Sequence, residues 1–237
     1  RVEQKAAHDY VSYVDKASEK RIVERLHELL PEAGFIAEEG SGSLEEQEYC
    51  WVVDPLDGTS NYIHDCTPYC VSIALRNREE ILLGVVYECG REELFWANKN
   101  SRAYLNGKEI CVSDQSVLDQ SFIMPELPYK AERYSPFILP LMRDLYGHVS
   151  GIRMLGSAAA ELCYVAAGRF EIFIEAFLGP WDIAAGYIIL KQAGGRMTDF
   201  SGNSNGPDAK EVLASNGKVH EELLKVLQRH KKLLKHE

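Results

Sequence analysis

The stretch from Trp51 to Asn61, Trp-Val-Val-Asp-Pro-Leu-Asp-Gly-Thr-Ser-Asn, places the tightest restriction on how this 237-residue chain can fold. Its apolar start favours a strand that ends at Asp54, because Pro55 prevents further sheet pairing. Gly58 then permits a sharp turn at which a helix can begin. The sequence therefore predicts that Asp54 and Asp57 point into one small volume.

Two carboxylates placed so close together repel each other unless a proton or a cation lies between them. Oxygen ligands at a turn suit Mg²⁺ far better than zinc, and the carbonyl oxygen of Leu56 offers a further ligand. The backbone N–H groups of Gly58 and Thr59, at the predicted helix start, are available to phosphate oxygens. Taken singly, Asp54 or Asp57 would more often be a turn or cap residue, so the interpretation depends on the combined string.

The formal net charge of −10 argues against nucleic acid or an anionic membrane as the main partner, because both require a basic protein surface. An acidic protein that acts on a phosphate ester must bring in positive charge, and a divalent metal held by carboxylates supplies it. No apolar run approaches the roughly 20 residues that cross a bilayer, and the first residues show no secretion signal. The six cysteines form no CxxC pair, which is typical of reduced thiols in a cytoplasmic protein.

Hydrophobic periodicity predicts an α+β or layered α/β protein without internal repeats. A tight hairpin turn is expected at Asn106-Gly107, and the strands before it are expected to form an antiparallel meander. The Gly-, Ser- and Glu-rich segment 40–48 is expected to be a mobile surface loop that can act as a lid. Helices are predicted over 10–30, 157–167, 182–193 and from Val219 onward, and strands over 35–38, 50–54, 70–75, 81–88, 93–97, 171–175 and 196–200.

The string Asp-Pro-Leu-Asp-Gly-Thr at 54–59 and the pair Trp181-Asp182 resemble the inositol monophosphatase family of magnesium-dependent, lithium-sensitive phosphatases. Members of that family carry D-P-[IL]-D-G-T after a strand and a W-D pair far downstream. The likeness spans nearly the whole chain and implies the alternating α-β-α-β-α sandwich of the sugar phosphatases. It implies one domain over 1–237, made of two packed halves of about 1–113 and 114–237.

The resemblance also implies the metal ligands. Glu38, in the Glu-Glu pair that precedes the string, would bind one Mg²⁺ together with Asp54 and the Leu56 carbonyl. Asp182 would bind a second Mg²⁺ together with Asp54 and Asp57, and many members need a third, looser ion near Glu38. Without the resemblance, Glu38 would be a solvated acid at a strand end, and Asp182 an acid favoured by the dipole at a helix start.

Further residues match the family at the reacting centre. Asp15 resembles the acid that pairs with the Thr of the string, so Asp15 and Thr59 would orient and help deprotonate the attacking water. Gly156-Ser157-Ala158-Ala159 is similar to the family segment G-[ST]-A-A, in which small residues open a helix beside the substrate; plain helix packing with Ser157 as the N-cap is the alternative. Glu175 matches an acid that contacts substrate hydroxyls. The implied substrate-binding residues are Asp57, Gly58, Thr59, Ala158, Glu175 and Asp182.

The activity implied is Mg²⁺-dependent hydrolysis of a phosphate monoester of a small polyol or sugar, foremost inositol 1-phosphate, by a homodimer. One alternative is a related phosphatase that acts on adenosine 3′,5′-bisphosphate, fructose 1,6-bisphosphate or histidinol phosphate. Ser60-Asn61-Tyr62 favours the inositol monophosphatase branch, since the nucleotidase branch tends to place Lys there. The other alternative, a non-catalytic regulatory binding protein, conflicts with a complete carboxylate set, which costs stability without metal.

Overall fold

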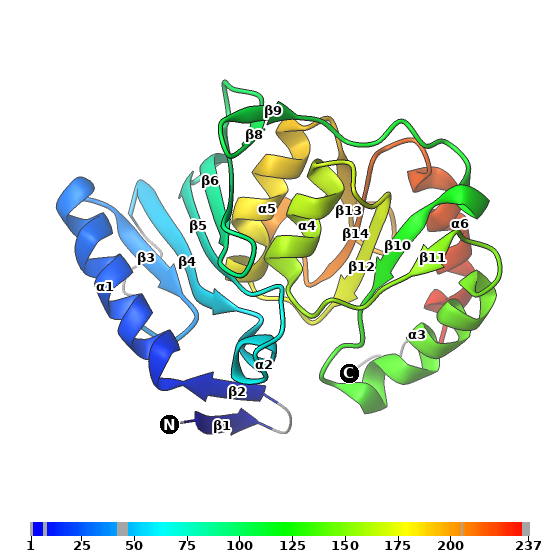
Figure 1. Ribbon diagram of the computed structural model, residues 1–237, viewed down its shortest axis with the longest axis horizontal. Helices are drawn as coiled ribbons and strands as arrows, with labels where there is room; N and C mark the ends of the chain where they lie inside the picture. The colour runs from blue at the N-terminus through cyan, green and yellow to red at the C-terminus, as the bar shows by residue number, and fades with distance from the viewer. Residues whose placement is uncertain (1, 7–8, 42–46, 205, 234–237) are drawn as a thin grey trace.

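Helices and strands form five layers in the computed structural model, which describes residues 2–6, 9–41, 47–204 and 206–233 (Figure 1). One helix covers the outer face of a seven-stranded sheet, two helices lie between this sheet and a five-stranded sheet, and two more cover the far face of the latter. The predicted α-β-α-β-α sandwich is thus confirmed. In layer order, the helices are α1 (Tyr13–Leu29), then α4 (Ala158–Ala166) with α5 (Pro180–Gln192), then α3 (Ala131–Leu145) with α6 (His220–Lys231).

The seven-stranded sheet carries the first half of the chain. Its strands, in spatial as in sequence order, are β3 (Gly34–Ala37), β4 (Tyr49–Asp57), β5 (Cys70–Asn77), β6 (Ile81–Glu88), β7 (Glu93–Asn98), β8 (Ala103–Leu105) and β9 (Lys108–Ile110). β3 and β4 are parallel, and all later neighbours are antiparallel, as the predicted meander requires. Asn106 and Gly107 join β8 to β9 with φ values of 47° and 78°, as expected for a hairpin turn.

β4 differs from its prediction in one respect that matters for the site. It does not end at Asp54 but resumes pairing at Asp57, with a register shift between these two residues where Pro55 interrupts the ladder. The helix α2 (Thr59–Ile63) follows directly. A bulge, rather than a strand end, therefore brings the two carboxylates to the edge of the site.

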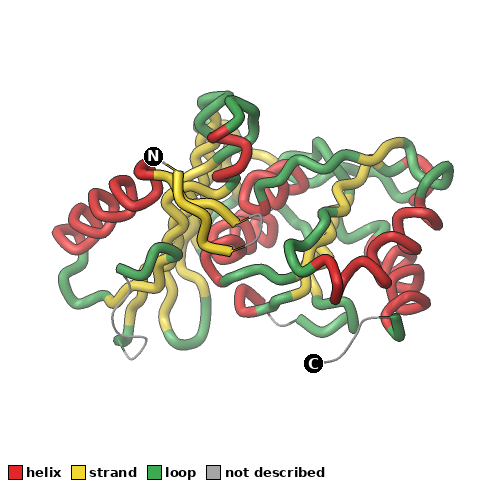
Figure 2. Tube along the Cα trace, turned by 90° about the horizontal axis from the view of Figure 1, so that it is seen from below, coloured by secondary structure: helices red, strands yellow, loops and turns green. Residues whose placement is uncertain are grey.

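The five-stranded sheet is mixed, with the order β11 (Gly151–Ile152), β10 (Phe122–Pro125), β12 (Ile172–Ala176), β14 (Glu211–Ser215) and β13 (Arg196–Thr198). β10 is parallel to both of its neighbours, and β14 is antiparallel to both of its own. A separate pair, β1 (Val2–Ala6) and β2 (Asp9–Ser12), precedes α1 (Figure 2). The first helix therefore begins at Tyr13 and not at Tyr10 as predicted, because the residues before it pair as a strand.

β4 is apolar on both faces because it lies between two layers of helix. Val52 belongs to the central core around α4 and α5, whereas Trp51 and Val53 pack in the outer core against α1. A strand buried on both faces has a continuous apolar run, as observed here. Segment 40–48 has residues 42–46 outside the described part of the chain, so its role as a lid stays a prediction.

α5 packs unusually close to both of its neighbours in the central layer. A methyl group at Gly84 of β6 would lie 2.6 Å from the carbonyl oxygen of Ala185, and one at Gly186 would lie 2.7 Å from Cβ of Leu162 in α4. These two positions tolerate no side chain without a shift of backbone or core. The sheet and α4 together therefore fix the position of α5. None of the described helices is both long and apolar enough to cross a membrane.

Candidate active site

A cleft of about 400 Å³ opens where the β4–α2 turn, the start of α4 and the loops after β10 and β12 meet. Asp15 lies outside its lining and is linked to it by the hydrogen bond that Thr59 donates. The cleft gathers the other predicted site residues although they come from both halves of the sequence. They are Glu38, Asp54, Leu56, Asp57, Gly58, Thr59, Ala158, Glu175 and Asp182.

Asp54, Asp57 and Asp182 form the centre of this cleft, with carboxylate oxygens that all lie within 4.8 Å of one another. Burial raises the pKa of Asp54 well above its ordinary value, and the neighbouring carboxylates, Glu38 first, raise it further. Burial also raises the pKa of Asp57 to about 6 and that of Asp182 well above its ordinary value. Glu38 lines the same cleft but is not one of the three carboxylates in that tight group.

Each of the three carboxylates is held by hydrogen bonds from the protein. Asp54 accepts the Leu56 N–H at 2.9 Å. Asp182 accepts the Gly179 N–H at 2.7 Å from the first turn of α5, which begins at Pro180 rather than at Asp182 as predicted. The prediction missed this first turn because proline usually interrupts a helix. At the first helical position, however, proline is tolerated, since the N–H that it lacks would have no partner within the helix.

Asp57 is held by the N-terminus of α4. Its carboxylate accepts the Ser157 hydroxyl at 2.6 Å and the Ala159 N–H at 2.8 Å. Ser157 does precede the helix, but its side chain makes no capping hydrogen bond and is turned to Asp57. The small-residue segment thus fixes a carboxylate as well as opening a helix.

The hydroxyl of Thr59 lies 3.0 Å from two acceptors, Asp15 Oδ1 and the Leu56 carbonyl oxygen. A threonine hydroxyl has one proton, so it can donate to only one of them at a time. Asp15 is 1% exposed in the first turn of α1, where the β4–α2 turn covers it. The predicted Asp15–Thr59 contact is therefore present, and its direction depends on what else the Leu56 carbonyl binds.

Gly58 is required by the turn for two independent reasons. Its φ of 85° lies in the left-handed region, and a Cβ there would lie 2.9 Å from the Pro68 carbonyl oxygen. Nearby, the Asn61 side chain donates to the carbonyls of Pro68 at 2.8 Å and Leu155 at 2.6 Å. Asn61 thereby ties the motif to the segment that precedes Ser157.

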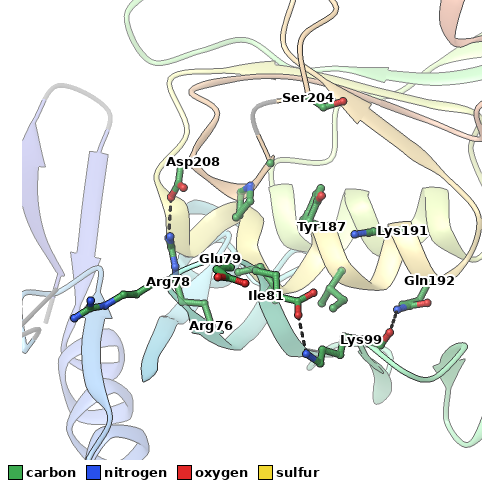
Figure 3. A pocket seen from close by; sticks show the side chains of 14 residues that line it. Arg76, Arg78, Glu79, Ile81, Lys99, Tyr187, Lys191, Gln192, Ser204 and Asp208 are labelled. Atoms are coloured by element: carbon green, nitrogen blue, oxygen red, sulfur yellow. Dashed lines mark hydrogen bonds and ion pairs between the residues drawn. The ribbon is translucent and has the colours of Figure 1, made fainter. Parts of the chain in front are cut away.

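A second hollow, shown in Figure 3, lies along the later turns of α5 and holds none of the predicted site residues. It carries basic side chains, but Arg76 pairs with Asp208 at 2.9 Å and Lys99 with Glu80 at 2.7 Å. These ion pairs neutralise two of the four basic side chains that line this hollow. The acidic cleft is therefore the better candidate for chemistry.

The family to which this chain belongs is shown by its match to a family model. The model of the inositol monophosphatase family matches residues 1–232. This chain belongs to that family. It is accordingly a phosphoric monoester hydrolase, as the resemblance implied.

Individual relatives match this inositol monophosphatase family member over nearly its full length. It is 37% identical over 234 residues to the Nus factor SuhB of Pseudomonas aeruginosa, with 97% of this chain and 86% of that protein covered. It is also 37% identical over 229 residues to the fructose-1,6-bisphosphatase/inositol-1-monophosphatase of Aquifex aeolicus, with 97% and 86% covered. Among solved structures, the IMPase of Thermotoga maritima superposes with a TM-score of 0.90 at 34% identity, covering 98% of this chain and 89% of that one.

Glu19 supports the site but was not predicted from the sequence. It is 1% exposed in α1, and its carboxylate accepts the N–H groups of Glu39 at 2.8 Å and Ser41 at 2.9 Å. Glu19 thus holds the turn that follows Glu38. One signal was available, since Asp15 and Glu19 lie four residues apart and share one face of the helix.

Two further glutamates, Glu126 after β10 and Glu161 in α4, adjoin Glu175 and were also not predicted. Glu126 accepts the Leu155 N–H at 2.7 Å. Both oxygens of Glu161 are buried and accept no hydrogen bond from an N–H group or hydroxyl of the described residues. Burial, with Glu126 as the next cause, raises the pKa of Glu161 and of Glu175 well above the ordinary value. Buried acids outside any motif leave no pattern that a single sequence reveals.

Proposed function

We propose that this enzyme hydrolyses the phosphate monoester of a small polyol or sugar, foremost inositol 1-phosphate, with Mg²⁺ as cofactor. The observation that carries the proposal is the group of Asp54, Asp57 and Asp182 within 4.8 Å, next to the Asp15–Thr59 contact. A site for an uncharged ligand would not bring three acids together in this way, because their mutual repulsion destabilises the fold when no cation is bound.

The donor chemistry of the cleft fits magnesium. Its ligand atoms are carboxylate and carbonyl oxygens, which Mg²⁺ prefers, and the tight group contains no His or Cys, which zinc favours. We assign one ion to Glu38, Asp54 and the Leu56 carbonyl, and a second to Asp54, Asp57 and Asp182. When bound, Mg²⁺ supplies positive charge to the phosphate and lowers the pKa of a water molecule.

Thr59 and Asp15 orient the attacking water in this mechanism. When the Leu56 carbonyl has another partner, the Thr59 hydroxyl donates its hydrogen bond to Asp15, which lies 3.0 Å away. The Thr59 oxygen is then free to accept a hydrogen bond from the water, which aligns the water for attack. A buried Asp15 that faces no solvent holds this arrangement through the reaction.

The remaining residues bind the two ends of the ester. The N–H groups of Gly58, Thr59 and Ala158, at turns and helix starts, suit the phosphate oxygens. Glu175 lines the same cleft without being one of the three carboxylates in the tight group, and it suits substrate hydroxyls as an acceptor. Asp57 and Asp182 would contact both the metal and the leaving oxygen.

The names of relatives do not choose the substrate, because identity is the same 37% to the SuhB protein and to the fructose-1,6-bisphosphatase/inositol-1-monophosphatase. A role like that of a Nus factor is the second candidate, and the common ancestry with SuhB supports it. The complete carboxylate set favours hydrolysis first. Absence of a nucleic acid partner, a homodimer, lithium sensitivity, a cytoplasmic location and one domain of two halves stay predictions.

Phosphate release from a panel of esters tests the proposal. The panel holds inositol 1-phosphate, fructose 1,6-bisphosphate, adenosine 3′,5′-bisphosphate and histidinol phosphate, each with Mg²⁺ or EDTA. We expect Mg²⁺-dependent release, highest on inositol 1-phosphate, lost in Asp57→Asn and kept in Asp119→Asn, the same change at an exposed acid. Absence of release from every ester would refute the assignment, and another preferred ester would change the substrate alone.

A further inference from the structure

Phe177 has a backbone conformation that a large side chain rarely adopts. Its φ is 70°, in the left-handed region, although a phenylalanine pays for that conformation with steric strain. It lies directly after β12, two residues beyond Glu175, and lines the cleft. Strained residues that persist at a binding cleft are a reason to look for a function.

Contacts on two sides hold Phe177 in this conformation. Its N–H donates to the Lys210 carbonyl oxygen at 2.7 Å, which fixes the backbone. The ammonium group of Lys130 lies 4.4 Å from the ring centroid and covers part of the ring. The side chain nevertheless stays 44% exposed. A fixed aromatic surface is therefore presented to the cleft.

Two other large apolar side chains share this edge of the cleft. Leu127 is 49% exposed and Tyr129 is 59% exposed, and both line the cleft from the loop that joins β10 to α3. We call Leu127, Tyr129 and Phe177 the apolar rim. Leu127 and Phe177 lie within two residues of Glu126 and Glu175 in the chain, and all four line the cleft, so an apolar surface and hydroxyl acceptors occur together there.

We propose that the apolar rim, and Phe177 above all, binds the carbon face of a ring-shaped leaving group and so selects cyclitol or hexose monophosphates over acyclic ones. The proposal rests on the proposed function and names the substrate class of that same cleft. A cyclitol or pyranose presents C–H groups on its faces and hydroxyls around its edge. The faces match the ring of Phe177, and the edge matches Glu175 and Glu126.

The strain fits this role because a side chain fixed before binding loses little freedom when the substrate arrives. A flexible aromatic residue at the same point would have to be ordered by each substrate molecule. The strained backbone thus lowers the stability of the fold, but the aromatic surface is in place before the substrate binds. Two variants separate the ring from the strain: Phe177→Ala removes the ring and keeps the strained conformation, whereas Phe177→Gly removes both.

The experiment compares kcat/KM for inositol 1-phosphate and for glycerol 2-phosphate, which has no ring. We expect both variants to lose about fivefold on inositol 1-phosphate and less than about twofold on glycerol 2-phosphate. Phe177→Gly should also melt about 3 °C above Phe177→Ala, because glycine relieves the backbone. Tyr146 is an exposed aromatic residue that directly follows α3 and lies outside the cleft lining. Tyr146→Ala is therefore the control and should change kcat/KM for neither ester.

Equal losses on the two esters, or no loss on either, would overturn the proposal. If the wild-type enzyme releases phosphate from neither ester, the proposed function fails, and calorimetry with inositol 1-phosphate and Mg²⁺ decides this inference separately. Binding about fivefold weaker to Phe177→Ala than to the wild type would support it. Equal binding to both proteins would overturn it.

Discussion

Replacement of Asp57 by asparagine should make the metal-free protein more stable while it abolishes catalysis. Two of the hydrogen bonds to Asp57 end on the same oxygen, Oδ2, at 2.6 Å from Ser157 and 2.8 Å from Ala159. An asparagine oxygen can occupy that position and keep both bonds. Its amide group then takes the place of the other oxygen and is an uncharged donor in the same group as the Asp54 and Asp182 carboxylates.

The size of the effect follows from the pKa of Asp57, which is raised from 3.8 to about 6, mainly by burial. Each pKa unit corresponds to about 1.4 kcal/mol, so ionised Asp57 costs the folded state at most about 3 kcal/mol. For a chain of this length, 1 kcal/mol shifts Tm by about 2–4 °C. The variant should therefore melt on the order of 6–12 °C higher in EDTA at pH 7.5.

The pH dependence has a definite sign. Because the folded state holds the Asp57 proton more tightly than the unfolded state, the stability gained from that proton is full below pH 3.8 and is lost as pH rises through about 6. Asp57→Asn has no such proton. The difference in Tm between variant and wild type should thus grow from pH 4 to 6 and stay constant above.

Thermal unfolding followed by circular dichroism measures this effect, in EDTA and in millimolar Mg²⁺. Mg²⁺ should stabilise the wild type, since it binds only the folded site, and should have little effect on Asp57→Asn. When Mg²⁺ is added, the two melting temperatures should therefore converge, or their order should reverse. An Asp57→Asn protein that is no more stable than wild type in EDTA at pH 7.5 would refute the argument that burial of the ionised Asp57 costs stability.

Three other predictions follow from the contacts described. Thr59→Val should lower kcat about 100-fold with little change in KM, because only the orientation of the water is lost; an unchanged kcat in steady-state assays would contradict this. His220 is buried between Ser215 at 2.8 Å and Thr198 at 3.0 Å, and burial lowers its pKa from 6.5 to about 4. Urea unfolding should therefore show stability falling by up to about 1.4 kcal/mol per pH unit as pH drops from 6.5 to 4, a slope absent in His220→Gln. Gly84→Ala should cost about 1–3 kcal/mol by displacing α5, and an unchanged Tm would show that the helix has room to move.

The local part of the site could be predicted from the sequence because it is encoded within a few residues. Asp54, Asp57 and Gly58 follow from strand propensity, a proline and a glycine in one short string. Their partner Asp182 and the acid Glu38 carried only the ordinary features of a helix start and a strand end. These two residues were assigned by resemblance to the family, since no local sequence pattern shows which residues of distant segments come together in the fold.

Other features escaped prediction for identifiable reasons. Helix α3 contains Pro136 and Pro140, which normally argue against a helix, but its buried face of apolar residues outweighs them. Glu126 and Glu161 could not be predicted because what distinguishes them is their proximity to each other and the hydrogen bond from the Leu155 N–H to Glu126. Tertiary packing, and not local propensity, decides such positions.

The place of α5 in the centre of the molecule has a consequence for synthesis on the ribosome. The seven-stranded sheet is complete at Ile110, yet α4 and α5, which cover its inner face, emerge only with residues 158–192. During that interval the nascent chain carries an apolar sheet surface without its cover and a set of carboxylates without Asp182. A message truncated before residue 182 would therefore yield a chain that lacks one of the three clustered carboxylates and exposes a surface on which chaperones and proteases act.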